Sequence, residues 1–340
     1  MNKLNFFIRK NIIDCIRFPE YKEKVKENKK IIYEMTGKKV KFIDIFKKCY
    51  PIKGTLEDYF WFKFYKRTPE ECAKFITYGR HQDIYNILNP EENKKLFKDK
   101  GEFNKIFKDF LKRDFIDLRE ASLENYKKFV EKHPTYISKP AGGSSGYKVE
   151  KIKTNSSTNL EELYNKHIEQ RCFVLEEVII QHPEMAKLNP NSVNTIRVVT
   201  SKTEKGIRPF IVAMRIGAGD AVADNLNNGG MACSIDTKTG KINSHAITKK
   251  IDLTYDEHPT TKVPLLGFQI PNYDKVIECC LKAHELLDMD LIGFDIAITK
   301  EDCCIVEGNS TPMYDIIQMP KNEGRYYEFL EEFTKLKGKI

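Results

Sequence analysis

Two short segments near the C-terminal end constrain the fold of this chain most strongly. Residues 293–299 (Gly-Phe-Asp-Ile-Ala-Ile-Thr) and 305–309 (Ile-Val-Glu-Gly-Asn) have the composition of strands, and a polar, turn-like segment separates them. We predict a β-hairpin with a loop of two to four residues. Because side chains on a strand alternate between faces, Glu307 and Asn309 point the same way, and Asp295 falls opposite residue 306 or 307.

That pairing brings two carboxylates and one amide oxygen to a single face of the hairpin. Hard oxygen ligands of this kind suit Mg²⁺ that holds a nucleotide triphosphate. Asp295, Glu307 and Asn309 are therefore our candidate metal ligands. A hairpin with polar residues on its solvent face produces the same alternation, so both interpretations stay open at this point.

Composition and charge narrow the class of protein. With 340 residues, the chain is long enough for two domains or one composite domain. Its net charge of +8, from 57 basic and 49 acidic residues, is a mild and dispersed excess that favours anionic ligands and does not indicate nucleic-acid binding. Nine cysteines, with adjacent pairs at 279–280 and 303–304, fit neither a disulfide framework nor a zinc site, so we expect reduced thiols and a cytoplasmic location.

Membrane insertion is not expected from the sequence. No apolar run approaches the ~20 residues that span a bilayer. The first ten residues become charged too early for a signal peptide.

The first third of the chain has helical periodicity. An apolar stripe recurs at helical spacing with basic residues among its members: Leu4, Phe7, Ile8, Ile12 and Ile16 with Arg9, Lys10 and Arg17. We interpret it as a helix packed on its own domain, and peripheral contact of a basic amphipathic helix with a membrane is the alternative. The aromatic segment 55–65 predicts a helix in a domain core, with stacking on a ligand as the alternative.

From about residue 115 the pattern changes to strands mixed with few helices. We predict strands at 115–118, 136–139, 147–153, 173–178, 193–201, 207–216, 231–236 and 241–247, and helices at 122–132, 159–170 and 273–287. Such an order favours an α+β fold with antiparallel sheets over a doubly wound parallel sheet.

A glycine- and serine-rich loop, residues 142–146, lies between two of these predicted strands. It lacks the strand–turn–helix context of a dinucleotide fingerprint. Backbone N–H groups of such a hairpin loop can donate to phosphate oxygens, and Lys139 just before it supplies a positive charge. The candidate phosphate-binding residues of the loop are Gly142, Gly143, Ser144 and Ser145. A flexible loop without a ligand is the alternative.

Three further segments add polar groups to this picture. The extended stretch around residue 178 offers main-chain groups to an adenine edge, and Glu184 could hold ribose hydroxyls. Arg197 and Arg215 lie in β-rich runs, where they need anionic partners: a triphosphate, a carboxylate or a structural ion pair. The turn-rich loop 224–230, which contains Asn225, either reaches over a ligand or simply turns the chain.

In this order, these pieces resemble ATP-grasp enzymes. The segments 175–188 (Leu-Glu-Glu-Val-Ile-Ile-Gln-His-Pro-Glu-Met-Ala-Lys-Leu), 192–197 (Ser-Val-Asn-Thr-Ile-Arg) and 293–299 resemble the sugar-transfer-associated ATP-grasp proteins of bacterial surface-polysaccharide loci. The resemblance covers roughly residues 90–320. It implies two α+β subdomains that clamp ATP between antiparallel sheets: a helical N-terminal region at 1–95, a small lobe with the glycine-serine loop at 96–180, and a large lobe with the metal-binding hairpin at 181–340.

The resemblance also implies residue roles. It gives Lys100 and Lys139 contacts with adenine-side atoms and the α- and β-phosphates. It makes Glu176, Glu177 and Val178 the hinge strand that reads adenine, and Glu184 the acid that holds the ribose. Asp295, Glu307 and Asn309 would be the ligands of two Mg²⁺ ions. The catalytic groups near the transferred phosphate would be Arg215, Arg197 and Asn225. Two positions depart from the family pattern. Gly293 stands where many ligases of the superfamily have arginine, and residues 310–313 read Ser-Thr-Pro-Met where many relatives have Ser-Pro-Gly.

The activity implied is that of an ATP-dependent carboxylate–amine ligase with an acyl-phosphate intermediate. Its expected partners are small-molecule carboxylate and amine substrates, sugar-linked in the setting of the family, with ATP and two Mg²⁺ ions as cofactors and no nucleic acid. A phosphotransferase of the same fold and a non-catalytic polysaccharide-binding module are the alternatives.

Overall fold

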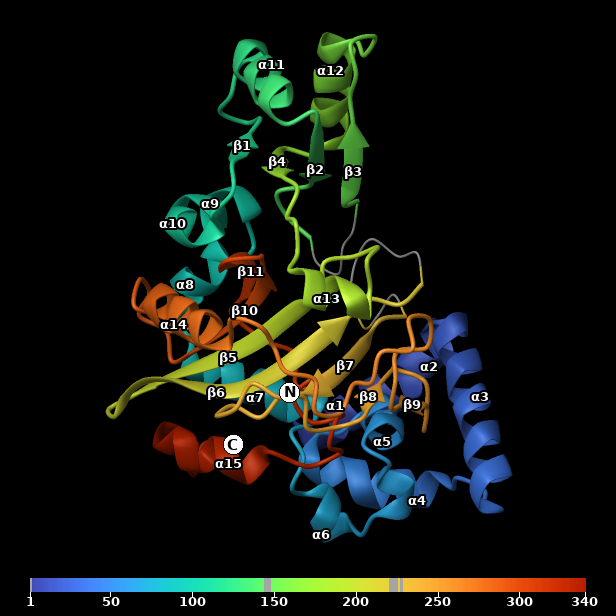
Figure 1. The fold of residues 1–340 in the computed structure, drawn as a ribbon. Helices are drawn as coiled ribbons and strands as arrows, with labels where there is room; N and C mark the ends of the chain where they lie inside the picture. Colours follow the sequence, from blue (N-terminus) through green and yellow to red (C-terminus); the bar gives the residue numbers. More distant parts are fainter. Residues whose placement is uncertain (1, 144–147, 220–225, 227–228) are drawn as a thin grey trace.

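The protein is described here by a computed structural model that covers residues 2–143, 148–219, 226 and 229–340. Three predicted site residues, Ser144, Ser145 and Asn225, lie outside these ranges. Figure 1 places a small sheet at the top, a large sheet in the middle, and the N-terminal helices around and below the large sheet. The α+β architecture with antiparallel sheets and a helical N-terminal region is confirmed.

The N-terminal region consists of short helices with one long one. They are α1 (Lys3–Ile8), a π-helical turn (Arg9–Ile13), α2 (Asp14–Arg17), α3 (Pro19–Thr36), α4 (Phe42–Cys49), α5 (Leu56–Trp61), α6 (Pro69–Cys72), α7 (Tyr78–Leu88) and α8 (Glu91–Leu96). Pro19 starts α3, where its missing N–H costs nothing. Gly37 ends α3 in the left-handed conformation, with φ of 68°.

The aromatic segment 55–65 lies in the domain core, as predicted, but its helix is shorter. Thr55 and Asp58 form a reciprocal capping box at the start of α5. Lys63 adopts a left-handed conformation with φ of 54°, so the helix does not continue to Tyr65. Phe62, on this connection, is completely buried.

The small sheet has four antiparallel strands in the order β1-β4-β2-β3. Their bounds are Phe115–Asp117 for β1, Thr135–Lys139 for β2, Glu150–Lys153 for β3 and Val174–Glu177 for β4. Helices α11 (Leu123–Lys132) and α12 (Leu160–Gln170) bury Tyr126, Tyr136 and Leu175 with the sheet. The Asn159 side chain accepts a hydrogen bond from the Glu162 N–H and caps α12, as predicted.

The large sheet has seven antiparallel strands in the order β11-β10-β5-β6-β7-β8-β9. The strands are β5 (Thr195–Thr203), β6 (Gly206–Ile216), β7 (Met231–Ser234), β8 (Ala246–Ile247), β9 (Thr254–Tyr255), β10 (Leu291–Ile298) and β11 (Cys303–Asn309). The predicted strand over 241–247 is wrong for most of its length. The chain turns at Asp236, whose carboxylate binds the Thr239 N–H, and only the last two residues of the segment pair as a strand.

Each face of the large sheet packs on different helices. One face shares a core with the N-terminal helices and α15 (Tyr326–Glu332), through residues such as Val199. The other face packs on α9 (Lys100–Ile106), α10 (Lys108–Leu111) and α14 (Tyr273–His284), through residues such as Val198. Helices α9 and α10, which the sequence assigned to the small lobe, thus join the core of the large sheet. The predicted domain boundaries themselves stay a prediction.

Candidate nucleotide and metal site

The hairpin β10–β11 has the predicted register. Its turn covers residues 299–302, and Asp295 pairs directly with Glu307 while Gly293 pairs with Asn309. A bulge at Val306 follows, since Ile296 pairs with Ile305. The three candidate metal ligands therefore lie on one face of neighbouring strands, although their role as ligands stays a prediction.

Two arginines hold the Asp295 carboxylate. Arg197 lies directly opposite Asp295 on β5, and its Nη2 donates to Asp295 Oδ2 at 2.8 Å while Nε donates to Oδ1. Arg215 on β6 donates to Oδ2 as well. Burial alone raises the pKa of Asp295, but the two guanidinium groups outweigh it and keep the pKa below its ordinary value. Of the anionic partners considered for Arg197 and Arg215, the structure thus shows an ion pair within the protein, and the partner is the predicted metal ligand Asp295.

Position 293, where the resemblance leads us to expect an arginine, is a glycine with little space around it. A Cβ atom added to Gly293 would lie 2.8 Å from Pro312 Cβ, closer than real Cβ contacts come, and 3.4 Å from Arg197 Cδ. The guanidinium group next to Asp295 belongs to Arg197 on the neighbouring strand β5. A side chain at position 293 would fill the space through which Arg197 reaches Asp295.

Glu307 and Asn309 have groups left for a ligand. Burial and the nearby Asp295 charge raise the pKa of Glu307. Among the described residues, the buried Nδ2 of Asn309 has no hydrogen-bond acceptor. An unsatisfied buried donor costs about 1–3 kcal/mol, so a ligand oxygen here would be stabilising. The oxygen-rich set fits Mg²⁺, provided that the ion shares the Asp295 carboxylate with the two arginines.

On the small-lobe side, Glu176 collects three partners that fully occupy its carboxylate. Lys139 on β2 lies 2.5 Å from one oxygen, and Asn104 on α9 donates to the same oxygen at 2.6 Å. Arg113 donates to the other oxygen at 2.9 and 3.1 Å. Burial alone raises the pKa of Glu176, but Arg113 and Lys139 bring it down to about 2. The Glu176 side chain thus ties α9 and Lys139 together. Sequence reasoning missed Arg113 and Asn104, which carry no motif.

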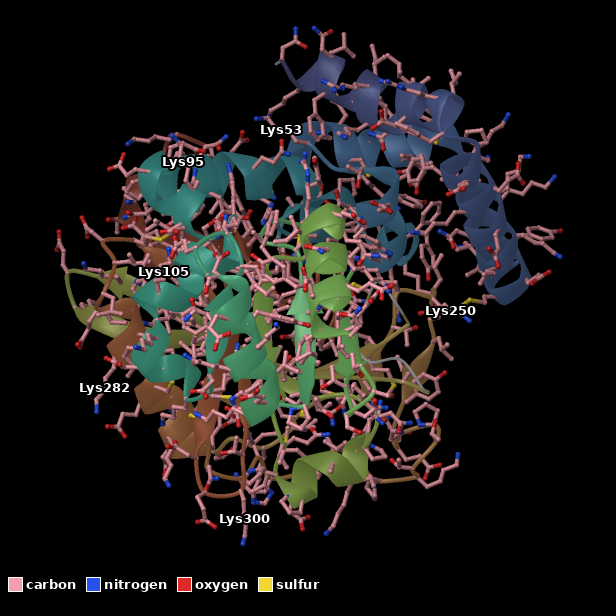
Figure 2. All side chains as sticks on the ribbon, turned by 90° about the horizontal axis from the view of Figure 1, so that it is seen from above. Lys53, Lys95, Lys105, Lys250, Lys282 and Lys300 are labelled. Carbon is pink, nitrogen blue, oxygen red and sulfur yellow. The ribbon has the colours of Figure 1, made fainter. Side chains whose placement is uncertain are left out.

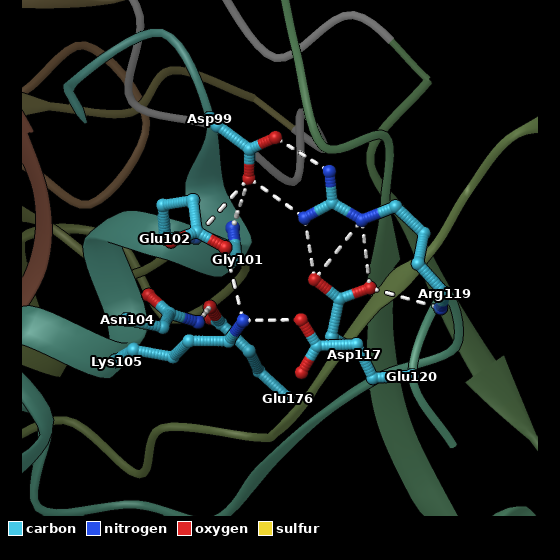
Figure 3. Close-up of polar contacts among 9 residues, drawn as sticks. All are labelled: Asp99, Gly101, Glu102, Asn104, Lys105, Asp117, Arg119, Glu120 and Glu176. Carbon is cyan, nitrogen blue, oxygen red and sulfur yellow. Dashed lines mark hydrogen bonds and ion pairs between the residues drawn. The ribbon is translucent and has the colours of Figure 1, made fainter. Parts of the chain in front are cut away.

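Lys100 is positioned by the start of α9. The Asp99 carboxylate accepts hydrogen bonds from the first N–H groups of this helix and is held by Arg119, which Figure 3 shows between Asp99 and Asp117. The Lys100 ammonium donates to the Gly143 carbonyl at 2.8 Å. Burial and the charge of nearby Lys139 lower the pKa of Lys100, which indicates a site built for an anion.

A cavity of about 440 Å³ lies between these two walls. It brings together seven predicted site residues, Lys100, Lys139, Gly143, Arg197, Arg215, Glu307 and Asn309. Gly143 has a φ of 100°, which favours glycine at this rim of the cavity.

Other predicted residues do not line the cavity. The Glu177 side chain points away from Glu176 and accepts a hydrogen bond from the Asp114 N–H. Glu184 forms an ion pair with Lys187, 2.6 Å away on α13 (Pro183–Leu188). Both carboxylates thus have protein partners, and the predicted nucleotide contacts of Glu177, through main-chain groups, and of Glu184 stay predictions. Asp295 is 1% exposed and lies behind the cavity wall. Gly142, at the start of the glycine-serine loop, and Val178, just after the end of β4, are not among the residues that line the cavity.

The far end of the cavity contains an ion pair that sequence reasoning did not single out. Lys249 lies 2.9 Å from Asp315, and its ammonium is 4.2 Å from the centre of the Trp61 ring. Both charged residues line the cavity, and Asp315 is buried. Since an ammonium has three N–H donors, the carboxylate and the ring leave capacity for one more acceptor.

Comparisons with known proteins agree with this architecture. The sequence model of a family described as sugar-transfer associated ATP-grasp matches residues 79–334. A search of curated proteins found no match. Similar solved structures include the ATP-grasp ligase PsnB with its minimal precursor (13% identity, TM-score 0.39, 68% of this chain and 57% of that one). Another is the D-alanine–D-alanine ligase of Helicobacter pylori (16%, 0.44, 75% and 64%). The chain thus spans less than two thirds of the length of these structures.

Proposed function

Because this chain belongs to the sugar-transfer-associated ATP-grasp family, we propose that it is an ATP-dependent carboxylate–amine ligase. The observation that carries the proposal is the cavity, where oxygen donors of the β10–β11 hairpin face two lysines of the opposite wall, Lys100 and Lys139. Oxygen donors on one side and cations on the other are what a triphosphate with its divalent ions requires.

In the proposed reaction, a substrate carboxylate attacks the γ-phosphorus of ATP, the bond to the bridging oxygen of the β-phosphate breaks, and ADP leaves. An amine then attacks the acyl phosphate, loses a proton and displaces inorganic phosphate, so that an amide forms. No nucleophilic side chain is needed, because positioning and electrostatics do most of the work.

The cavity residues have separable tasks in this scheme. Lys100 and Lys139 bind phosphate oxygens, and Arg197 and Arg215 stabilise negative charge at the transferred phosphoryl group. Glu307 and Asn309, with Asp295 behind them, would hold Mg²⁺, which when bound would neutralise charge on the phosphate oxygens. The buried carboxylate of Glu176 keeps Lys139 in place.

The far end of the cavity suits the acid substrate. Lys249 is fixed by Asp315 and Trp61 and presents a cation beyond the two arginines. A carboxylate bound to Lys249 would be oriented next to the γ-phosphate site. We propose that the sugar-linked substrates implied by the family description bind at this end of the cavity. We also propose that the reaction takes place in the cytoplasm, since all nine cysteines are free thiols.

The test is ADP release with MgCl₂ and a panel of uronic acids and amino acids, with product mass analysis. The ligase reading requires an amide product and inorganic phosphate. A stable phosphorylated product would instead favour the phosphotransferase. No binding of ATP with Mg²⁺ in calorimetry would refute both.

A further inference from the structure

The positive charge of the chain, which we expected to be dispersed, is in fact concentrated at its N-terminus. Residues 1–50 contain 14 of the 57 basic residues and only 6 of the 49 acidic ones, which leaves 43 of each in the other 290. The first 50 residues therefore carry the whole net charge of +8. Figure 2 shows the dark blue helices of this region along one edge of the molecule, and in Figure 1 α3 lies at the right-hand edge.

The same region exposes an unusual amount of apolar surface. Nine of the fourteen large hydrophobic side chains that are exposed among the described residues lie within the first 43 positions. Five of these exposed side chains lie between the start of α1 and the residue after α2: Leu4, Ile8, Ile13, Ile16 and Phe18. Of these, Ile16 is 75% exposed. Single exposed apolar residues are ordinary, whereas a contiguous group marks an interaction surface.

Neighbouring elements extend this surface. The rings of Phe7, buried under α1, and Phe42, at the start of α4, lie 6.0 Å apart. Phe42 therefore lies next to the packed side of α1, and Phe42 and Ile43 are 54% and 55% exposed. Exposed cations lie among these residues, at Arg9, Arg17 and Lys41.

The fold and the cavity do not account for these exposed residues. Phe6 and Phe7 supply the side of α1 that packs on the protein, and none of the outward residues lines the cavity. Of the two interpretations of the N-terminal stripe, a helix packed on its own domain thus explains the inner side alone.

We propose that this N-terminal face, defined by Leu4, Ile8, Ile13, Ile16 and Phe18 with Arg9 and Arg17, docks on an anionic membrane surface. Exposed Ile, Leu and Phe gain free energy by entering the interfacial region, and the adjacent cations pair with anionic headgroups. A second copy of the chain fits less well, because a symmetric contact would bring two faces of the same positive charge together. Nucleic acid offers the apolar side chains no comparable gain.

The experiment is sedimentation of the purified full-length chain with phosphatidylcholine vesicles, with or without about 30% phosphatidylglycerol. We expect binding to the anionic vesicles, weakened as salt rises from about 50 to about 300 mM. The double variant Ile16→Glu/Phe18→Glu should lower the partition coefficient on the order of tenfold, and Arg9→Glu/Arg17→Glu should lower it by a similar factor.

Matched controls alter the same residue types elsewhere. Leu266→Glu, at a side chain that is 60% exposed, and Lys238→Glu/Lys300→Glu should leave vesicle binding within about twofold of wild type. Equal binding to neutral and anionic vesicles, or equal loss in the controls, would overturn the proposal. The proposal would also be overturned if the chain dimerised with rising concentration and the dimer required Ile16 and Phe18. The same holds if a duplex DNA competed with the vesicles for binding and its binding required these two residues. Thermal unfolding of each variant checks that the fold is kept.

Discussion

On one wall of the cavity the Glu176 carboxylate is buried with three partners, whereas on the other wall Asp295 and Glu307 face each other and share two arginines. In the first cluster Lys139, Asn104 and Arg113 occupy both oxygens of Glu176, so this carboxylate is fully paired, whereas the Asn104 Oδ1 beside the cavity has no donor among the described residues. The second cluster has two acids in contact and, among the described residues, leaves Asn309 Nδ2 without an acceptor. Buried polar groups that are fully paired support structure, and buried groups that lack partners indicate where a ligand binds.

The comparison is tested most severely at Glu307. The variant Glu307→Gln should lower ADP release on the order of 100-fold, because a charged oxygen ligand is lost. Its unfolding midpoint should not fall, since the change removes a buried acid that repels Asp295. Coupled-enzyme kinetics and thermal unfolding measure both. Glu301→Gln, in the exposed turn of the same hairpin, is the control and should behave as wild type. Wild-type activity in Glu307→Gln would sink the metal assignment.

At the Glu176 cluster, by contrast, a substitution is expected to lower the stability of the fold. Glu176→Gln leaves Lys139 and Arg113 buried without their counter-charge, which should cost about 3 kcal/mol of unfolding free energy. Urea unfolding measures the loss. Glu150→Gln, an exposed position on β3 of the same sheet, should cost less than about 0.5 kcal/mol. Equal stability of the two variants would show that the Glu176 cluster is not structural.

The same cluster predicts a pH dependence. The folded pKa of Glu176, about 2, lies below its ordinary value of 4.5. A depressed folded pKa contributes stability that is fully present above the unfolded value and is lost as pH falls toward the folded one. The stability difference between wild type and Glu176→Gln should therefore be constant near pH 6 and shrink from about pH 4.5 downward. A difference that grows on acidification would contradict the sign.

At the far end of the cavity a smaller, substrate-specific effect is expected. Lys249→Met should raise the KM for the acid substrate about tenfold, because one charge-assisted hydrogen bond is lost. The Kd of ATP with Mg²⁺, measured by calorimetry, should stay within about twofold. Lys249→Arg should recover part of the loss, and Lys250→Met, next to it on the exposed surface, should have no effect. A rise in the ATP Kd without a change for the acid would refute the assignment of Lys249.

The smallest effect is expected at Gly143, which lines the cavity. Gly143→Ala places a Cβ on a residue with φ of 100°, which costs about 1 kcal/mol and should weaken ATP binding severalfold. Gly142→Ala is the matched control, since its added Cβ would meet only the Lys98 carbonyl oxygen at 3.7 Å. Equal ATP affinities in both variants would remove the glycine requirement at position 143.

Much of the fold could be predicted because local patterns carried it. The alternation in residues 293–309 predicted both the hairpin and the Asp295–Glu307 register, and the Asn159 cap and the core aromatic residues of 55–65 were also recognisable. The strand over 241–247 failed between Ile242 and Ala246, where the Ser244 hydroxyl takes the place of a main-chain carbonyl and accepts the Ser234 N–H. The nucleotide roles of Glu177 and Glu184 stay predictions, since a family role says nothing about which neighbour a side chain pairs with.

The sequence by itself determined which residues can alternate on a strand, cap a helix or carry charge, and so it determined the hairpin, the family and the concentration of charge in the first 50 residues. Only the tertiary structure decided that Arg197 from β5 holds Asp295, that Glu176 is held by three protein partners, and that Lys249 rests on Trp61. These contacts join residues far apart in the chain. Their formation depends on how the sheets and helices pack, which short-range patterns do not encode.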